Sequence, residues 1–186
     1  GAYVMLTAEK REIQALAREF SDHEIRPHAE AWDAAAELPD SLFASLAEVG
    51  FMGMQVPEQH GGLGLDFTTF LLVVEELSRG DASVGLSLSI HNGPVVGLIN
   101  RRATEEQKAA WLPRLATGEW IGIFALSEAQ AGSDARALEA TARREGEEWV
   151  LEGAKAWVTN GQRSGLALVF ARTGAEGEIS CFAVPT

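Results

Sequence analysis

The hydrophobic pattern of this chain changes its period near residue 120. Before that point apolar residues recur at helical spacing, as Ile13, Leu16 and Phe20 do on one face of a charged segment. After it, short apolar runs are separated by Gly-containing turns, which is typical of β-strands. The sequence therefore predicts an α+β fold, in which an all-helical N-terminal domain, residues 1–120, is followed by an antiparallel β domain, residues 121–186.

Residues that start and stop helices divide the first 120 positions. Thr7 and Thr104 can each cap a helix, and Gly50 can end one. The stretch from Ser83 to Asn100 is almost uncharged, which predicts a helix buried on nearly all sides and broken near Pro94. We expect a helix that starts at Thr7 and is interrupted at Pro27, and further helices at 29–36, 42–49, 67–78, 83–100 and 105–116.

Apolar runs between glycines fill the rest of the chain. We expect strands at 121–126, 137–143, 149–159, 166–173 and 179–184. Only Pro185 and Thr186 follow the last of them. Because a small antiparallel sheet leaves an edge that needs further pairing or cover, we expect the β domain to be incomplete in this chain.

Charge and cysteine content exclude several classes of protein. The formal net charge of −12 argues against nucleic-acid binding and against an anionic membrane surface. Cys181 is the only cysteine, so no internal disulfide can form. The first six residues lack the basic flank of a signal peptide, and we expect no apolar run long enough to span a bilayer. We therefore expect a soluble intracellular protein.

Two segments of the predicted β domain carry groups suited to a ligand. A strand through Phe124 leads to Ser127 and the turn Ala131-Gly132-Ser133, whose backbone N–H groups and hydroxyls suit an anionic oxygen or a phosphate. On the expected 149–159 strand, Trp157 and Thr159 share one face, so an indole stands beside a hydroxyl. A flat ring with hydrogen-bonding edges would fit such a surface.

These segments carry a family resemblance. Leu126-Ser-Glu-Ala-Gln-Ala-Gly-Ser-Asp134 and Gly153-Ala-Lys-Ala-Trp-Val-Thr-Asn-Gly161 closely resemble the two signature segments of the acyl-CoA dehydrogenase family of flavoproteins, in the same order and at the same spacing. The resemblance spans essentially the whole chain. Further matching stretches are Glu24–Ala29, Val56–Gly64, Glu75–Ser78, Glu105–Lys108 and Trp111–Pro113.

The resemblance implies a cofactor, a reaction and missing parts. Members of the family use FAD for the α,β-dehydrogenation of an acyl-CoA thioester, in which a base removes the α-proton and the β-hydrogen leaves as hydride to flavin N5. Their chains continue with more of the β domain and a C-terminal helical domain that supplies the catalytic glutamate. On this resemblance, residues 121–186 are the first part of the flavin-binding domain, the C-terminal helical domain is absent, and no catalytic base lies in this chain.

The resemblance also assigns binding roles position by position. Ser127 and its neighbours match the segment that holds the isoalloxazine ring, Ser133 matches the serine at the flavin pyrophosphate and near the substrate thioester, and Trp157 matches the ring-packing indole. Ala129-Gln130 replaces the family's frequent Pro-Gly, which leaves the form of this turn open. The predicted cofactor-binding residues are Phe124, Ala125, Leu126, Ser127, Gly132, Ser133, Trp157, Val158 and Thr159, and Ser133 is also the predicted substrate contact.

Each of these residues also has a structural interpretation. Trp157 alone would more often be a core or interface aromatic, Ser127 and Thr159 strand-end hydroxyls, and Gly132-Ser133-Asp134 a turn or a helix N-cap. The two segments together favour the flavin-binding interpretation.

Other polar residues are interpreted as structural. Glu128 and Asp134 suit turn capping and salt bridging, and Lys155 suits an ion pair, with a phosphate contact as the alternative. His91-Asn92 could line an acyl pocket, but a buried and hydrogen-bonded histidine is the favoured interpretation. No metal site is expected, because the remaining histidines, His23, His28 and His60, lack ligand spacing.

The resemblance leaves alternatives for the reaction and implies partners. A related acyl-CoA oxidase or flavin-dependent monooxygenase, or a non-catalytic binding module that retains the scaffold, would share these segments. Members of the family act in fatty acid or amino acid catabolism, form homotetramers or other homo-oligomers, and pass electrons to an electron-transferring flavoprotein. The expected location is the cytoplasm, or the mitochondrial matrix in a eukaryote. The sequence does not specify the length or branching of the acyl chain.

Overall fold

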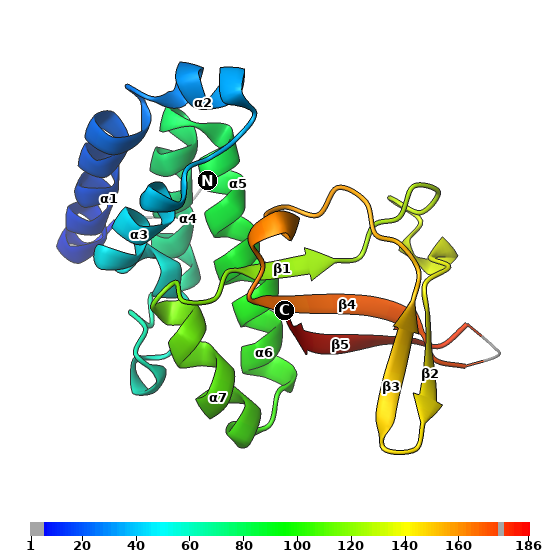
Figure 1. Cartoon of the computed structure of the whole chain (residues 1–186). Coiled ribbons are helices and arrows are strands. Elements are labelled where there is room, and N and C mark those ends of the chain that lie inside the picture. The colour runs from blue at the N-terminus through cyan, green and yellow to red at the C-terminus, as the bar shows by residue number, and fades with distance from the viewer. Residues whose placement is uncertain (1–5, 175–176) are drawn as a thin grey trace, which may run out of the picture. The chain divides into compact units, whose positions relative to one another are not determined.

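The chain divides into two compact units. The computed structural model describes residues 6–174 and 177–186. The first unit ends at Glu119 and is helical, and the second starts at Trp120 and contains the sheet (Figure 1). The predicted α+β fold, with a helical part before a β part, is confirmed.

Side-chain caps mark the starts of the longer helices. Thr7 accepts a hydrogen bond from the Lys10 N–H, and Thr104 forms a reciprocal capping box with Gln107, so both predicted caps are confirmed. Asp66 caps the helix that begins at Phe67, and its side chain accepts a hydrogen bond from the Thr69 N–H. The helices are α1 (Ala8–Phe20), α2 (Ala29–Ala35), α3 (Asp40–Glu48), α4 (Phe67–Gly80), α5 (Ala82–Ile90), α6 (Gly97–Arg102) and α7 (Glu105–Ala116).

The helical unit is organised around α4, which packs against α1 and α5 (Figure 1). Glu76 of α4 is only 3% exposed, and its carboxylate accepts hydrogen bonds from Arg18 of α1 and Arg79. These bonds, above all the one from Arg18, hold the pKa of Glu76 below its usual value. The largest fully buried side chains of the unit include Ile25, Leu46, Phe51, Met52, Met54, Leu77, Leu88, Leu112 and Leu115.

One long helix forms from α5, a π-helical turn at His91–Val96 and α6. The π turn contains Pro94, at the position where the sequence predicts a break. By length and composition Ala82–Arg102 could cross a membrane, which the sequence interpretation did not anticipate. Half of its most apolar window is buried inside the unit, as in the core helix of a globular domain.

His91 and Asn92 are completely buried in this helix. His91 Nε2 lies 2.9 Å from the Met52 carbonyl and 3.1 Å from that of Leu115, while Asn92 donates to the Phe51 carbonyl at 2.9 Å. Burial lowers the pKa of His91 to about 4, against the smaller opposing effect of these hydrogen bonds, so the ring is neutral at pH 7. The prediction of a buried, hydrogen-bonded histidine is confirmed.

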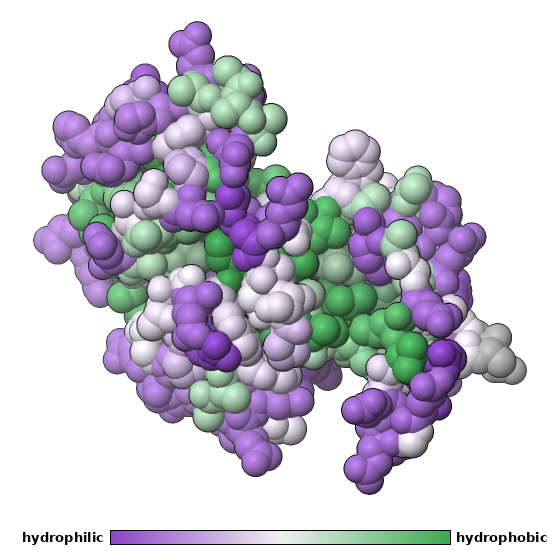
Figure 2. All heavy atoms as spheres, in the orientation of Figure 1, coloured by the Kyte–Doolittle hydropathy of each residue, from purple (hydrophilic) through white to green (hydrophobic). Residues whose placement is uncertain are grey.

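The second unit contains a five-stranded sheet centred on β4. The strands are β1 (Gly122–Ala125), β2 (Thr141–Glu145), β3 (Glu148–Glu152), β4 (Leu166–Arg172) and β5 (Ile179–Pro185). β4 pairs antiparallel with β5 along its whole length and parallel with β1, and its last residue pairs parallel with β2. β2 and β3 form an antiparallel hairpin whose hydrophilic surface is seen in Figure 2.

The sequence predicts an antiparallel sheet, but the sheet is mixed, because β4 pairs parallel with β1 and with β2. Forty residues separate the end of β1 at Ala125 from the start of β4 at Leu166, enough chain for the β2–β3 hairpin to form and for β4 to run in the same direction as β1. The predicted strand at 137–143 is also displaced, because residues 135–137 form a 3₁₀ turn and β2 starts only at Thr141.

The predicted strand at 149–159 is wrong beyond Glu152. Gly153 adopts φ 143°, and a Cβ at this position would lie 2.7 Å from the Ala140 Cβ, so the chain turns where the two backbones approach closely. Trp157 and Asn160 follow at φ 59° and 61°, in the left-handed region that a strand cannot include. Trp157, Val158 and Thr159 therefore lie in a loop, not on a strand face.

Replacement of Gly85 tests the packing of α5 on α4. A Cβ at Gly85 would lie 1.8 Å from Ser78 Oγ and 3.0 Å from the Ser78 Cα, so Gly85→Ala is expected to destabilise the fold by about 1–3 kcal/mol. At Gly93 the nearest atom is 3.9 Å away, and Gly93→Ala is the matched control, expected to leave stability unchanged or raise it. Urea unfolding of both variants measures the difference, and equal midpoints would contradict the close approach.

Candidate functional site

The two signature segments lie against each other in the β unit. The Ala156 N–H donates to the Ser127 carbonyl over 2.9 Å. Lys155 donates to the Leu126 carbonyl over 3.1 Å. The end of β1 and the loop after β3 are thus joined directly, although Ser127 and Ala156 are 29 positions apart in the sequence. The structure brings together the two stretches whose polar groups the sequence analysis singled out.

A buried ion pair connects the same segments. Glu128 is 5% exposed, and its carboxylate lies 2.7 Å from Lys155 Nζ, whose side chain is 10% exposed. The carboxylate also accepts from Gln130 Nε2 at 2.8 Å and from the backbone N–H groups of Glu139 at 2.6 Å and Ala140 at 2.9 Å. The predicted structural pairing of both side chains is therefore confirmed.

These donors keep Glu128 ionised. Burial acts to raise the pKa of the carboxyl, but the hydrogen bonds from Lys155 and from the backbone at Glu139 and Ala140 outweigh it and lower the pKa to about 2. The sequence reasoning missed the two backbone donors. Its only signal was an acid placed between small residues just after an apolar strand.

The predicted residues at and just beyond the end of β1 contact the second signature segment through their backbone carbonyls. The Phe124 ring is partly buried and packs against Phe170 with centroids 4.9 Å apart, and Ala125 is buried. Leu126 and Ser127 are partly buried beyond the strand end. Their carbonyls accept from Lys155 and Ala156, and the Ser127 side chain remains at the junction.

The turn that carries Gly132 and Ser133 is open to solvent. Glu128 and Ala131 exchange two backbone hydrogen bonds, 3.0 and 3.1 Å long, which close the turn around Ala129-Gln130. Gly132 and Ser133 follow it, both exposed, and a Cβ placed on Gly132 would meet nothing within 4 Å. This exposed backbone can approach a ligand closely.

Trp157 is the most exposed large hydrophobic side chain described in the structure, at 93%. The interpretation of this indole as a core aromatic therefore does not hold, and its exposed ring suits an interface or a ligand. Val158 and Thr159 are partly buried beside it, and Asn160 Nδ2 is buried without a hydrogen-bond partner among the described residues. The loop thus exposes a flat apolar surface close to a buried amide donor that has no partner among the described residues.

These features fit the flavin of FAD. An isoalloxazine ring needs a flat surface for its face and hydrogen-bonding groups at its edge, and a pyrophosphate needs accessible N–H donors. Trp157 provides the surface, Ser127 and Thr159 the hydroxyls, and the Gly132-Ser133 turn the accessible backbone. The arrangement would suit a planar ligand with a polar edge.

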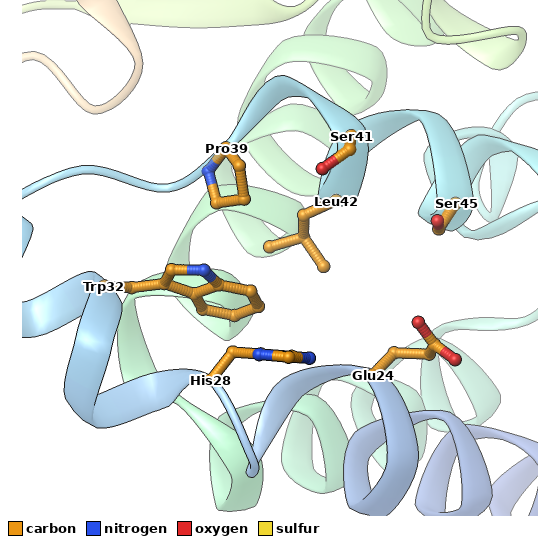
Figure 3. A pocket seen from close by; sticks show the side chains of 7 residues that line it. All are labelled: Glu24, His28, Trp32, Pro39, Ser41, Leu42 and Ser45. Carbon is orange, nitrogen blue, oxygen red and sulfur yellow. The ribbon is translucent and has the colours of Figure 1, made fainter.

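A separate hollow lies in the helical unit and contains no predicted site residue. It has a volume of about 190 Å³. Figure 3 shows Leu42 pointing into it, and the ring planes of His28 and Trp32 stack with centroids 5.5 Å apart. Its lining residues are Glu24, His28, Trp32, Pro39, Ser41, Leu42 and Ser45. Within residues 6–174 and 177–186, no three His, Cys, Asp or Glu side chains are grouped as metal ligands would be.

Comparison with known proteins identifies the family. Residues 7–119 match the N-terminal domain of acyl-CoA dehydrogenases, and residues 123–186 match the middle domain. The chain belongs to the acyl-CoA dehydrogenase family. The family predicted from the two signature segments is confirmed.

Individual members of the acyl-CoA dehydrogenase family are similar over most of this chain. The human mitochondrial short-chain specific acyl-CoA dehydrogenase is 42% identical over 171 residues, which are 90% of this chain and 42% of that protein. Glutaryl-CoA dehydrogenase from Mycobacterium smegmatis in complex with FADH2 superimposes with a TM-score of 0.90 at 37% identity, over 97% of this chain and 46% of that one.

A further solved structure, that of the electron transferring flavoprotein of Acidaminococcus fermentans, contains a chain with a TM-score of 0.94 at 36% identity, covering 100% of this chain and 50% of that one. The present chain therefore spans about half the length of its acyl-CoA dehydrogenase relatives.

The ionised state of Glu128 predicts how stability changes with pH in this family member. Because its pKa is lowered, the stabilisation from Glu128 is fully present above the usual glutamate pKa of about 4.5 and is lost as the pH falls toward about 2. Glu128→Gln lacks it at every pH and leaves Lys155 buried without its charge partner, which typically costs about 3–5 kcal/mol.

We expect the free energies of unfolding of the unmodified protein and of Glu128→Gln, measured between pH 7 and pH 3, to differ by a constant amount above pH 5. Below pH 5 this difference should shrink. A difference that does not shrink on acidification would contradict this assignment.

Proposed function

We propose that this chain forms part of an FAD-dependent acyl-CoA dehydrogenase that introduces a double bond between Cα and Cβ of an acyl-CoA thioester. The observation that carries the proposal is the junction of the two signature segments. There the Ala156 N–H donates a hydrogen bond to the Ser127 carbonyl, immediately before the exposed Trp157. Residues 1–120 would be the N-terminal helical domain, and residues 121–186 the first part of the flavin-binding domain.

When bound, FAD would supply the acceptor for the hydride that leaves the substrate Cβ. The chain's own residues would hold and orient it. Trp157 would pack against the ring, and Ser127 and Thr159 would donate to or accept from its polar edge. The Gly132-Ser133 turn would bind the pyrophosphate through backbone N–H groups, with Ser133 also near the substrate thioester.

The side chain of Glu128 is unsuited to remove the substrate α-proton. A general base works best when its pKa lies near the working pH, whereas the pKa of Glu128 is about 2 and its oxygens already accept from four groups. This supports the proposal that the catalytic base is a glutamate outside residues 1–186, in the C-terminal helical domain expected from the resemblance.

The remaining functional assignments follow from the same proposal. The substrate would be an acyl-CoA, the assembly a homo-oligomer such as a homotetramer, and the electron acceptor an electron-transferring flavoprotein. The location would be the cytoplasm, or the mitochondrial matrix in a eukaryote. Human and bacterial relatives named acyl-CoA dehydrogenases support the reaction class.

An absorbance spectrum tests the proposal on the full natural protein that carries this sequence. A flavin spectrum that bleaches under anaerobic conditions on addition of an acyl-CoA would support dehydrogenation. Rapid reoxidation of the reduced flavin by oxygen would instead favour an oxidase or a monooxygenase. A colourless protein that FAD does not reconstitute would favour the non-catalytic binding module and contradict the proposal.

Two tryptophan variants separate flavin binding from stability. Because Trp157 is 93% exposed, Trp157→Ala should change the free energy of unfolding by no more than about 0.5 kcal/mol, yet weaken FAD binding about tenfold through the loss of one aromatic contact. Trp149, whose ring packs against Phe182 at 5.3 Å, is the matched control.

Trp149→Ala should lower stability and leave FAD affinity unchanged. Chemical denaturation and titration of the apoprotein with FAD measure the two quantities. Unchanged FAD affinity in Trp157→Ala would remove this residue from the site.

A further inference from the structure

Lys155 is the point at which the two signature segments are held together by side-chain chemistry. Its Nζ donates to the Glu128 carboxylate at 2.7 Å and to the Leu126 carbonyl at 3.1 Å, so one ammonium group contacts the first segment twice. Lys155 itself belongs to the second segment, two residues before Trp157. We propose that Lys155 is a positioning residue of the flavin site, which holds the Trp157 loop against the end of β1.

The loop that carries Trp157 depends on Lys155 because few other contacts hold it. β3 ends at Glu152. Among the described backbone hydrogen bonds, one joins residues 153–157 to the first segment, from the Ala156 N–H to the Ser127 carbonyl. Trp157 contributes almost no burial to hold the loop in place. The position of the indole relative to Ser127 therefore depends on the Ala156 bond and on the side chain of Lys155.

Glu128 fixes the other end of this anchor. Its carboxylate is held by the backbone N–H groups of Glu139 and Ala140, at the start of the chain leading into β2, and by Gln130. The acceptor that Lys155 contacts is thus immobilised from three further sides. Because this carboxylate is fixed, the ammonium group that binds it fixes the position of the loop that carries Lys155. The contact is therefore more than an added surface ion pair.

The geometry also predicts that the pair cannot be reversed. Glu128 accepts from two backbone N–H groups, and a lysine at this position has no acceptor to offer them. The exchanged variant Glu128→Lys with Lys155→Glu would restore opposite charges but leave two donors facing an ammonium group. A simple requirement for one positive and one negative charge would be satisfied by the exchange, whereas the positioning role would not.

This inference rests on the proposed function, and variants of the full natural protein test it. Lys155→Met removes the ammonium group and keeps the length of the side chain, and Lys155→Arg retains a cation. Leu166→Ala is the control for stability alone. Leu166 is fully buried at the start of β4 and pairs with Gly122 at the start of β1, whereas Ser127 follows the end of β1. FAD dissociation constants are measured at a temperature where all variants keep the near-ultraviolet circular dichroism of the folded protein.

Lys155→Met is expected to raise the FAD dissociation constant at least tenfold, Lys155→Arg to recover most of that loss, and Leu166→Ala to stay within twofold of the unmodified protein. In the absence of FAD, hydrogen exchange at the Ala156 amide should accelerate in Lys155→Met and not in Leu166→Ala.

An FAD affinity of Lys155→Met within twofold of the unmodified protein, or an equal loss in Leu166→Ala, would overturn this inference while the unmodified protein still bound FAD. An unmodified protein that bound no FAD would overturn the proposed function as well. Full recovery of affinity in the exchanged variant would also contradict the positioning role.

Discussion

Buried backbone groups that lack a helix or strand partner must be paired by something else, and both units of this chain depend on a buried polar side chain for that purpose. In the helical unit, His91 and Asn92 reach the carbonyls of the segment that follows α3. In the β unit, Glu128 receives the N–H groups that precede β2. Each side chain brings together stretches that are distant in sequence.

The buried side chains of the two units differ in chemistry, because backbone carbonyls need donors and backbone N–H groups need acceptors. A neutral imidazole can donate without carrying charge into the core, and the pKa of about 4 for His91 keeps it neutral. Two N–H groups together favour an anion, and the carboxylate of Glu128 then requires Lys155 to balance its charge. The ion pair is thus a consequence of satisfying the backbone, and the position of the second signature segment follows from it.

Much of the fold can be predicted from the sequence because its signals are local. The hydroxyls of Thr7 and Thr104 cap the helices that follow them, and the change of hydrophobic period occurs where the chain passes from the first unit to the second. The parallel pairing of β1 with β4 has no local signal, because it depends on how 40 residues of intervening chain return. The loop after Glu152 was missed since alternation continues in the sequence while the backbone, at Gly153 and Trp157, does not.

The candidate site shows the same division. The identity of its residues could be predicted from two motifs, and the structure joins those motifs through Ser127 and Ala156. Their orientation could not be predicted, because whether Trp157 is buried or exposed depends on positive backbone dihedrals and not on its residue type. Likewise, a carboxylate at Glu128 does not by itself reveal which of four donors, 2 to 27 residues away, it will meet.

The π turn at His91–Val96 has a consequence for the whole helix from Ala82 to Arg102. A π turn accommodates one more residue than an α turn, so the residues beyond it are shifted by one step, roughly 100° around the axis. The part before the turn buries Val84 and Leu88, the turn itself buries Val95 and Val96, and the part after it buries Ile99. The turn therefore sets the direction in which Ile99 faces relative to Val84 and Leu88. Removing a single residue from the turn would convert it to an α turn and rotate Ile99, which is now 3% exposed, away from the core.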